Sequence, residues 1–164
     1  MEIRGSDPSF PPVYSSASRA LILGSYPSPQ SFAYGFYYGH PQNRFWPLLA
    51  QLTGYATPQS IFEKKSLVLE NSLALWDSLE QCSISGASDA SIRNPVPNDI
   101  PALLAKTSIQ AVFCNGAAAH KYYRLYCLPH TSIESICLPS TSPANAAYSM
   151  QRLLDAWQPL CCCL

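Results

Sequence analysis

The sequence predicts an α/β protein with a three-layer α/β/α fold, in which a four-stranded parallel sheet lies between helices. Two observations predict this class. Four short apolar runs have the composition of buried strands, and they occupy residues 20–23, 73–76, 111–114 and 135–138. Helical patterns fill the connections between these runs, and such alternation is typical of a parallel sheet that is covered on both faces.

The helix candidates lie at residues 44–52, 58–65, 99–106 and 117–125, each between two of the predicted strands. A last helix follows the fourth strand, where apolar residues recur at helical spacing from residue 145 to residue 157. We expect Ser142 and Pro143 to provide its cap and its first turn. Residues 83–98 are expected to form one long polar loop.

Length and composition indicate one globular domain. The chain has 164 residues, of which 48% are hydrophobic and 12% are charged, and these values argue against disorder. We expect a loose or edge-packed N-terminal leader at residues 1–17, a single domain at 18–160 and a Cys-rich tail at 161–164. No apolar run is long enough to cross a bilayer, and the N-terminus lacks the pattern of a secretory signal. These features predict a cytoplasmic monomer without a membrane partner.

The cysteines fit a reducing compartment. Four of the seven are isolated, without the CxxC pairs of zinc sites, and we expect most of them to be buried free thiols: Cys82, Cys114, Cys127 and Cys137. The terminal Cys161, Cys162 and Cys163 have three interpretations, namely a soft-metal site, a lipid anchor or no specific role. We favour the last, because a prenylation signal would have aliphatic residues at these positions. We predict no metal and no cofactor.

The segment after the first strand has the composition of an active-site rim. Gly24 permits close approach of backbone to a ligand, and a cluster of aromatic residues follows, including Tyr37 and Tyr38. Aromatic side chains in an irregular loop can stack on a planar ring. The segment ends at His40 and Asn43, directly before a predicted helix.

In open parallel sheets ligands bind beyond the carboxyl ends of the strands, so the loops that follow the four strands should share one rim. Asp77 then lies on this rim, although a turn-forming Asp is an equally good interpretation. Asn43 is either a helix cap or a group that binds a heterocycle or a water, with His40 nearby to orient it. Asn115 and Gly116 look like turn residues, whereas Arg44, Lys121 and Arg124 are the candidates for holding a polyanion.

The loop after the fourth strand, at residues 138–145, contains three consecutive hydroxyl side chains, Ser140, Thr141 and Ser142. Small hydroxyls and backbone N–H groups at the start of a helix can clamp a phosphate without positive charge. One hydroxyl would be enough for a helix cap, so three of them between prolines favour phosphate binding.

At these residues the chain resembles the uracil-DNA glycosylase superfamily, and most of all its hypoxanthine-DNA (deoxyinosine) glycosylase branch. The resemblance rests on several blocks in order. They are GSYP at residues 24–27, YY-x-HP-x-NRFW at 37–46, the segment at 75–92 with Trp76, Asp77 and the loop at 86–89, CNG at 114–116, and residues 138–145. It implies excision of hypoxanthine, or of uracil or xanthine, from duplex or single-stranded DNA for base excision repair.

The resemblance also implies roles for individual residues. An Asn at the place of Asn43 is implicated in the chemistry, and the base-stacking aromatic residue corresponds to Tyr38. Many members carry Asp or Asn two residues after the first-motif Gly, where this chain has Tyr26, whose phenol cannot act as a base at neutral pH. The chemistry must therefore be organised differently here.

We further expect Gly24, Ser25 and Asp77 to contact the base, and backbone N–H groups near Ser25 and Tyr26 to stabilise its negative charge. Ser140, Thr141 and Ser142 would hold phosphates, while Pro143 and Ala144 approach the gap left by the flipped nucleotide. Neither motif contains a suitably placed Lys, so hydrolysis is expected instead of a Schiff base. The competing hypotheses are a nucleic-acid-binding module of the same fold without activity, and a hydrolase of small nucleosides.

Overall fold

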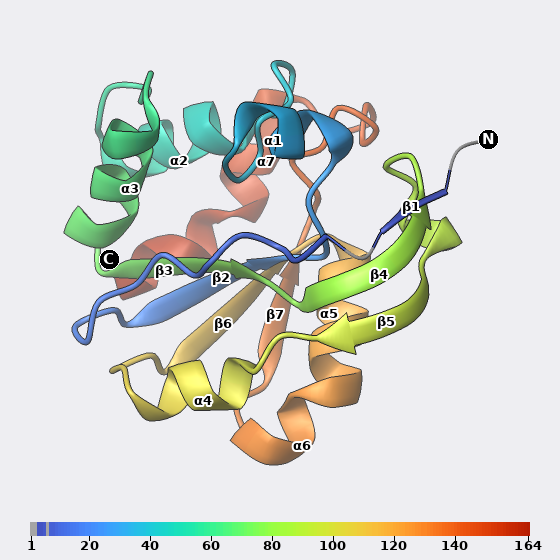
Figure 1. Ribbon diagram of the computed structural model, residues 1–164. Helices are drawn as coiled ribbons and strands as arrows, with labels where there is room; N and C mark the ends of the chain where they lie inside the picture. The colour runs from blue at the N-terminus through green and yellow to red at the C-terminus, as the bar shows by residue number, and fades with distance from the viewer. Residues whose placement is uncertain (1–2, 6) are drawn as a thin grey trace.

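In the computed structural model, which describes residues 3–5 and 7–164, helices cover both faces of a four-stranded parallel sheet (Figure 1). The predicted three-layer fold and its four strands are confirmed. The strands lie in the order β3-β2-β6-β7, and their bounds are β2 (Ala20–Gly24), β3 (Leu73–Asp77), β6 (Ala111–Asn115) and β7 (Ser135–Leu138). Strand β2 therefore lies inside the parallel sheet, with β3 on one side and β6 on the other. The strand order reverses at β2, and ligands bind at such points in open parallel sheets.

Alternate side chains of each strand face opposite layers, as the two-residue period of a strand requires. Ile22 packs in the core on one face, whereas Leu21 and Leu23 pack in the core on the other. The first face is covered by α2 (Phe45–Thr53), α3 (Ile61–Glu70) and α7 (Met150–Ala156). The second is covered by α4 (Ile100–Ala105), α5 (Ala117–Tyr126) and α6 (Leu128–Thr131).

A second, antiparallel sheet stands where we expected a polar loop at residues 83–98, so that prediction was wrong. Its strands are β1 (Ile3–Gly5), β4 (Leu79–Ser85) and β5 (Arg93–Pro97), in the order β1-β4-β5, with a short 3₁₀ helix η1 (Asp89–Ser91) between β4 and β5. Register shifts interrupt the pairing of β4 with β5 on both sides of Gln81. These irregularities break the alternation of apolar and polar residues by which a strand is recognised in a sequence.

Two helices begin at places that the sequence pattern did not indicate. The rim segment contains the short helix α1 (Pro29–Tyr34), which has Ser28 as its cap and Pro29 in its first turn. The last helix begins at Met150, because Ser149 and not Ser142 accepts a hydrogen bond from the N–H group three residues later. Residues 139–149 are therefore a loop, and the expected helix start at the hydroxyl cluster was wrong.

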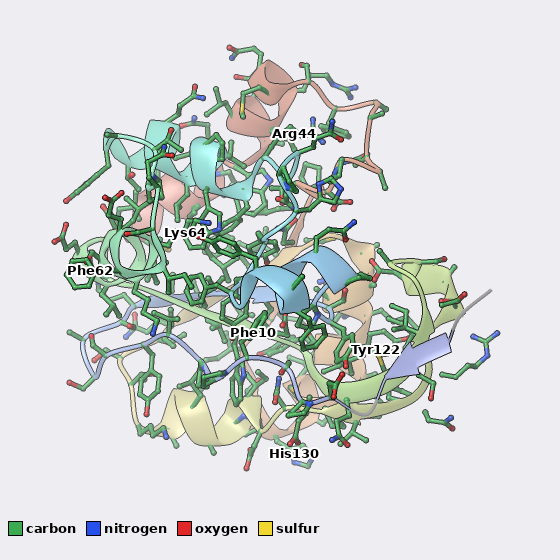
Figure 2. All side chains as sticks on the ribbon, turned by 45° about the horizontal axis from the view of Figure 1, so that its top comes forward. Phe10, Arg44, Phe62, Lys64, Tyr122 and His130 are labelled. Atoms are coloured by element: carbon green, nitrogen blue, oxygen red, sulfur yellow. The ribbon has the colours of Figure 1, made fainter. Side chains whose placement is uncertain are left out.

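The described parts of the N-terminal leader and of the C-terminal tail pack on the domain. The predicted leader includes residues 1, 2 and 6, which lie outside the described residues. Within the described part, the backbone of Val13 exchanges hydrogen bonds with that of Leu75, and the ring of Phe10 contacts the rings of Phe32 and Tyr37 (Figure 2). The Cys-rich tail belongs to a 3₁₀ helix, η2 (Gln158–Cys163), whose Leu160 is buried. Among the described helices, none has the length and apolar character that crossing a membrane requires.

Candidate active site

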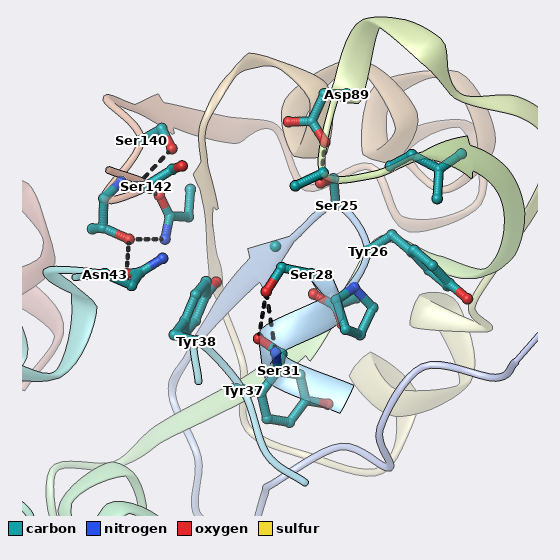
Figure 3. A pocket seen from close by; sticks show the side chains of 17 residues that line it. Ser25, Tyr26, Ser28, Ser31, Tyr37, Tyr38, Asn43, Asp89, Ser140 and Ser142 are labelled. Carbon is teal, nitrogen blue, oxygen red and sulfur yellow. Dashed lines mark hydrogen bonds between the residues drawn. The ribbon is translucent and has the colours of Figure 1, made fainter. Parts of the chain in front are cut away.

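A pocket lies at the carboxyl ends of the parallel strands, where the loops after all four meet as expected. Gly24 ends β2, Asp77 ends β3, Asn115 ends β6, and Ser140 follows β7. The pocket is lined by Gly24, Ser25, Tyr26, Pro27, Ser28, Ser31, Tyr37, Tyr38, Asn43, Asp77, Ile84, Ala87, Asp89, Asn115, Ser140, Thr141 and Ser142 (Figure 3). Most of the residues that the sequence indicated are therefore together in one place.

The side-chain oxygen of Asn43 is fixed by two donors. Its Oδ1 accepts a hydrogen bond from the N–H of Phe45 at 2.9 Å, at the start of α2, and another from Thr141 Oγ1 at 2.8 Å. Asn115 supports this contact, because its Nδ2 donates to Thr141 Oγ1 and its Oδ1 accepts from the N–H of Thr141, both at 3.0 Å. Asn43 precedes Arg44, the N-cap of α2, so it is not itself the cap, and its side chain links the start of that helix to Thr141 in the loop after β7.

These contacts determine which end of the Asn43 amide faces the pocket. Because Oδ1 is held by two donors, the amide cannot rotate by half a turn without placing Nδ2 against both of them. The Nδ2 group points towards the pocket, on the side of Tyr38 (Figure 3). Asn43 therefore presents hydrogen-bond donors, and not an acceptor, to a molecule in the pocket.

The ring of Tyr38 forms part of the pocket wall. It stacks on Phe45, with the ring centroids 4.2 Å apart and the planes inclined by 28°. The backbone of Tyr38 has a φ of 54°, in the left-handed region that non-glycine residues rarely adopt, and such conformations concentrate at functional sites. Its hydroxyl is buried near Asn115 but has no partner in hydrogen-bonding geometry, which is costly unless a ligand supplies one.

Asp77 forms the floor of the pocket, and the absence of a side chain at position 24 makes room for it. A Cβ atom on Gly24 would lie 2.5 Å from Asp77 Oδ1 and 3.0 Å from the hydroxyl of Tyr38. Asp77 is buried, its Oδ2 has no hydrogen-bond partner, and burial raises its pKa to about 8, with a smaller contribution from the charge of Asp89. The carboxyl group is therefore neutral at pH 7, so it can donate as well as accept a hydrogen bond.

A second carboxyl group reaches the pocket from the segment between β4 and β5. Asp89 Oδ1 accepts a hydrogen bond from the hydroxyl of Ser25 at 3.0 Å. Burial raises the pKa of Asp89, and the bond from Ser25 partly opposes that effect. The neighbouring Tyr26 lines the pocket, but its hydroxyl donates to the carbonyl of Asp7 at 2.6 Å, and its ring packs on Phe32.

The hydroxyl loop is held in shape by its own contacts. Ser140 Oγ accepts from the N–H of Ser142, and Ser142 Oγ accepts from the N–H of Ala144, so both hydroxyls support the turn and still line the pocket. Thr141 is fully buried, so its hydroxyl holds Asn43 and does not reach the surface where a phosphate would lie. The guanidinium of Arg44 donates to three carbonyls of residues 142–148 and fixes this loop to the start of α2.

Three predicted site residues lie outside the pocket lining. His40 precedes Asn43 in a turn, where its carbonyl accepts from the N–H of Asn43 and its Nδ1 accepts from that of Gln42. Pro143 and Ala144 lie farther along the hydroxyl loop, and Ala144 lines a shallow groove beside the pocket. His40 therefore shapes the chain around Asn43 and makes no contact inside the pocket.

Two residues that the sequence analysis did not select are prominent in the site. Asn115, which we interpreted as a turn residue, is the first residue on the rim after a buried strand, and this position was the signal that could have identified it. Asp89 ends the loop at 86–89, which is part of the family resemblance, but no role was assigned to it because the antiparallel sheet that presents it was not expected. The described residues contain no group of three or more His, Cys, Asp or Glu side chains that could hold a metal ion.

Comparisons with known proteins give a consistent result. The model of the family described as the Uracil DNA glycosylase superfamily matches residues 11–161. A protein named hypoxanthine DNA glycosylase from Methanosarcina acetivorans is 35% identical over 145 residues, which cover 87% of this chain and 90% of that protein. A second protein of that name, from Methanosarcina barkeri, is 31% identical over 138 residues, covering 83% and 86% of the two chains.

Among solved structures, the fold is similar to a solution NMR structure of a protein from Methanosarcina acetivorans that is provisionally described as a uracil DNA glycosylase. The TM-score is 0.82 at 30% sequence identity, and the alignment covers 98% of this chain and 97% of the other. The similarity therefore extends over both sheets and the helices, and it includes the segments that form the pocket.

Proposed function

The chain belongs to the uracil DNA glycosylase superfamily, and from this premise we propose that it removes hypoxanthine from DNA by hydrolysing the N-glycosidic bond. It is a DNA glycosylase that acts on deaminated bases. The observation that carries the choice of site is the fixed amide of Asn43, whose donors face a pocket that is also lined by the ring of Tyr38 and two carboxyl groups. We extend the proposal to uracil and xanthine as further substrates.

Asn43 would act on the departing base. When the bond between the sugar and the base breaks, the electron pair leaves with the base, which becomes an anion. A donor that is already oriented stabilises such charge without reorganisation, and a single donor of this kind contributes about 3 to 4 kcal/mol to the transition state. The bonds from Thr141 and from the N–H of Phe45 supply that orientation.

Tyr38 would stack on the flipped base. One face of its ring is occupied by Phe45, which leaves the pocket-facing side for a ligand. Stacking of a base on an aromatic ring contributes about 1 to 3 kcal/mol and suits every base. It would offset part of the few kcal/mol that extrusion of a nucleotide from the duplex requires, a cost that is smaller for a mispaired base.

Asp77 would recognise the edge of the base, together with Gly24, Ser25 and the backbone near Tyr26. In its neutral form Asp77 offers a donor and an acceptor side by side. Hypoxanthine presents the complementary pair, a ring N–H beside a carbonyl, and uracil and xanthine present the same pair. An ionised carboxylate would repel that carbonyl, so the buried, protonated state favours this group of bases.

The hydroxyl loop would contact the DNA backbone. Ser140 and Ser142 are half-buried and lie at the mouth of the pocket, with Pro143 and Ala144 beyond them towards the groove. Thr141 supports this loop from within, and His40 supports Asn43. We propose that duplex DNA is the partner, with single-stranded DNA as an alternative, and that the protein acts as a monomer in the cytoplasm, associated with the nucleoid in a bacterium.

The test is single-turnover base release from duplexes that contain hypoxanthine, uracil or xanthine. We expect release by the native chain and a rate at least about 100-fold lower for Asn43→Asp, which keeps both hydrogen bonds to Oδ1 but replaces the donors by an anionic oxygen. Asn43→Ala should lose the rate and also about 1 kcal/mol of stability, because the helix contact is lost. Asn43→Asp thus separates the role in catalysis from the role in folding.

Three other outcomes would contradict the proposal. Tight binding of duplexes without base release would indicate a nucleic-acid-binding module that lacks activity. Cleavage of free nucleosides at rates equal to those on DNA, with no effect of salt, would indicate a small-molecule hydrolase, because binding to a polyanion weakens as salt increases. A borohydride-trapped adduct with abasic DNA would contradict the hydrolytic route.

A further inference from the structure

The pocket contains a carboxyl group that none of the roles above uses. Asp89 lines both the pocket and the groove beside it; part of its surface is open to solvent, while the protein around its carboxyl group partly desolvates it. Asp89 is the first residue of η1, which connects β4 and β5 of the antiparallel sheet. A hydrogen bond from Ser25 joins it to the segment that follows β2. Ser25 and Asp89 are 64 positions apart in the sequence, so this contact exists only in the folded protein.

The two carboxyl groups of the pocket have different surroundings. Asp77 is buried on the floor and one of its oxygens has no partner, whereas Asp89 lies at the rim with its carboxylate directed towards the space between Ser25 and the hydroxyl loop (Figure 3). Within the described part of the chain, no Lys or Arg contributes to the electrostatics of Asp89. Two carboxyl groups in such unequal surroundings can take different roles, one as a hydrogen-bonding group on the floor and the other as a proton acceptor at the rim.

Hydrolysis of the glycosidic bond needs a group that accepts a proton from water, and the pocket offers few candidates. Asn43 presents donors, and the hydroxyl of Tyr26 is turned away to the carbonyl of Asp7. Asp77 is protonated at neutral pH and cannot accept a further proton. Asp89 is the remaining acceptor among the ionisable side chains that line the pocket.

Resting on the proposed function, we infer that Asp89 is the general base of the reaction and stabilises the cationic sugar. The oxygen of a water molecule attacks C1′ of the deoxyribose as the bond from C1′ to the base breaks. The electron pair of that bond leaves with the base, and one proton of the water passes to the carboxylate of Asp89. The base then takes up a proton from solvent, Asp89 releases its own, and an abasic sugar with a hydroxyl on C1′ remains.

This role also accounts for Ser25. Its hydroxyl donates to Oδ1 of Asp89, which leaves Oδ2 for the water. Ser25 is thus a positioning residue for Asp89. Asp77 at the end of β3 and Tyr122 on α5 are in electrostatic contact with Asp89, and the guanidinium of Arg93 on β5 acts on the same Tyr122.

The experiment compares the native chain with Asp89→Asn, Ser25→Ala and Glu80→Gln in single-turnover release of hypoxanthine from a duplex, between about pH 5 and about pH 9. Asp89→Asn keeps an acceptor for Ser25, so it removes the base and preserves the tether. Glu80→Gln is the matched control, because Glu80 is an exposed carboxylate of β4 outside the pocket lining. Binding to a duplex with a non-cleavable analogue is measured in parallel.

We expect the native rate to fall on the acid side, as Asp89 becomes protonated, and Glu80→Gln to behave in the same way. Asp89→Asn should lose at least about 100-fold in rate and should lose the acid limb, with binding retained. Ser25→Ala should lose about 10-fold and keep the acid limb. A native profile without an acid limb, an Asp89→Asn rate within threefold of native, or a slower Asp89→Asn with an unchanged profile would each overturn the inference. Absence of release by the native chain itself would instead overturn the proposed function, and this inference with it.

Discussion

Replacing Thr141 by valine should weaken both the fold and the reaction, because its hydroxyl is a buried link between Asn43 and Asn115. Valine has nearly the same shape, so no cavity forms, but two hydrogen bonds of 2.8 and 3.0 Å are lost. Each contributes about 0.5 to 1.5 kcal/mol, and the Nδ2 group of Asn115 loses its acceptor inside the protein. We expect a loss of about 2 kcal/mol in the free energy of unfolding.

The assay is urea unfolding combined with single-turnover release of hypoxanthine. With a denaturant slope of about 2 kcal/mol per molar, the unfolding midpoint should fall by about 1 M. The rate should fall by about 10-fold to 100-fold, because Asn43 keeps only the contact with the N–H of Phe45 and its donors are less precisely placed. Thr141→Ser should restore the rate, since it keeps the hydroxyl, although the loss of a buried methyl group still costs about 1 kcal/mol of stability.

Thr53→Val provides the control. Thr53 lies at the far end of α2, and its hydroxyl donates to the carbonyls of Leu49 and Ala50, away from the pocket. We expect a small change in stability and none in rate. The reasoning would be refuted if Thr141→Val lost stability but released hypoxanthine as fast as the native chain, because the hydroxyl would then have no part in orienting Asn43.

Three further predictions concern the walls and floor of the pocket. Gly24→Ala should reduce the rate of hypoxanthine release by at least about 10-fold while the far-ultraviolet circular dichroism stays native. The new Cβ would lie 2.5 Å from Asp77 Oδ1 and must displace it. A rate equal to native would show that the position of Asp77 does not matter for the reaction. Tyr38→Phe should keep the stacking and raise the urea unfolding midpoint, since it removes a buried hydroxyl that has no partner. Tyr38→Leu should weaken binding of hypoxanthine duplexes by about 10-fold or more, because the aromatic ring is lost. Equal binding of these duplexes by both variants would exclude stacking. Burial raises the pKa of Asp77 from 3.8 to about 8, so between these pH values the native state holds a proton that the unfolded state has lost. The free energy of unfolding should therefore fall as pH rises through this range, by up to about 1.4 kcal/mol per pH unit. Urea unfolding from pH 4 to pH 8 should show that Asp77→Asn removes this dependence, and an identical slope in both proteins would mean that Asp77 is ionised in the fold.

The parallel sheet was predictable because its strands are short and apolar on both faces. Residues 20–23, for example, have no polar side chain, and nearly continuous apolar runs of this kind are typical of strands that helices cover on two sides. The antiparallel sheet was not predictable in this way. In β4 the buried residues Leu79, Cys82 and Ile84 are spaced by three and then by two, since register shifts interrupt the alternation.

The helix after β7 shows a second limit. Its apolar face was visible in the sequence, but three Ser residues, at positions 140, 142 and 149, were all able to cap it. The choice of Ser149 depends on the loop at residues 139–149, which is held by bonds from Arg44 to carbonyls about one hundred positions away. Such contacts leave no local pattern in the sequence.

The sequence by itself determined the four parallel strands, the edge at which the pocket lies and the segments that supply Gly24, Tyr38, Asn43 and Asp77. These follow from local apolar runs and from the rule for open parallel sheets. Only the tertiary structure decided which end of the Asn43 amide faces the pocket and which carboxyl group is neutral. It also decided that Asp89 lies there at all. The physical reason is that orientation and ionisation depend on donors, burial and charges contributed by elements far apart in the chain, which come together only when the protein folds.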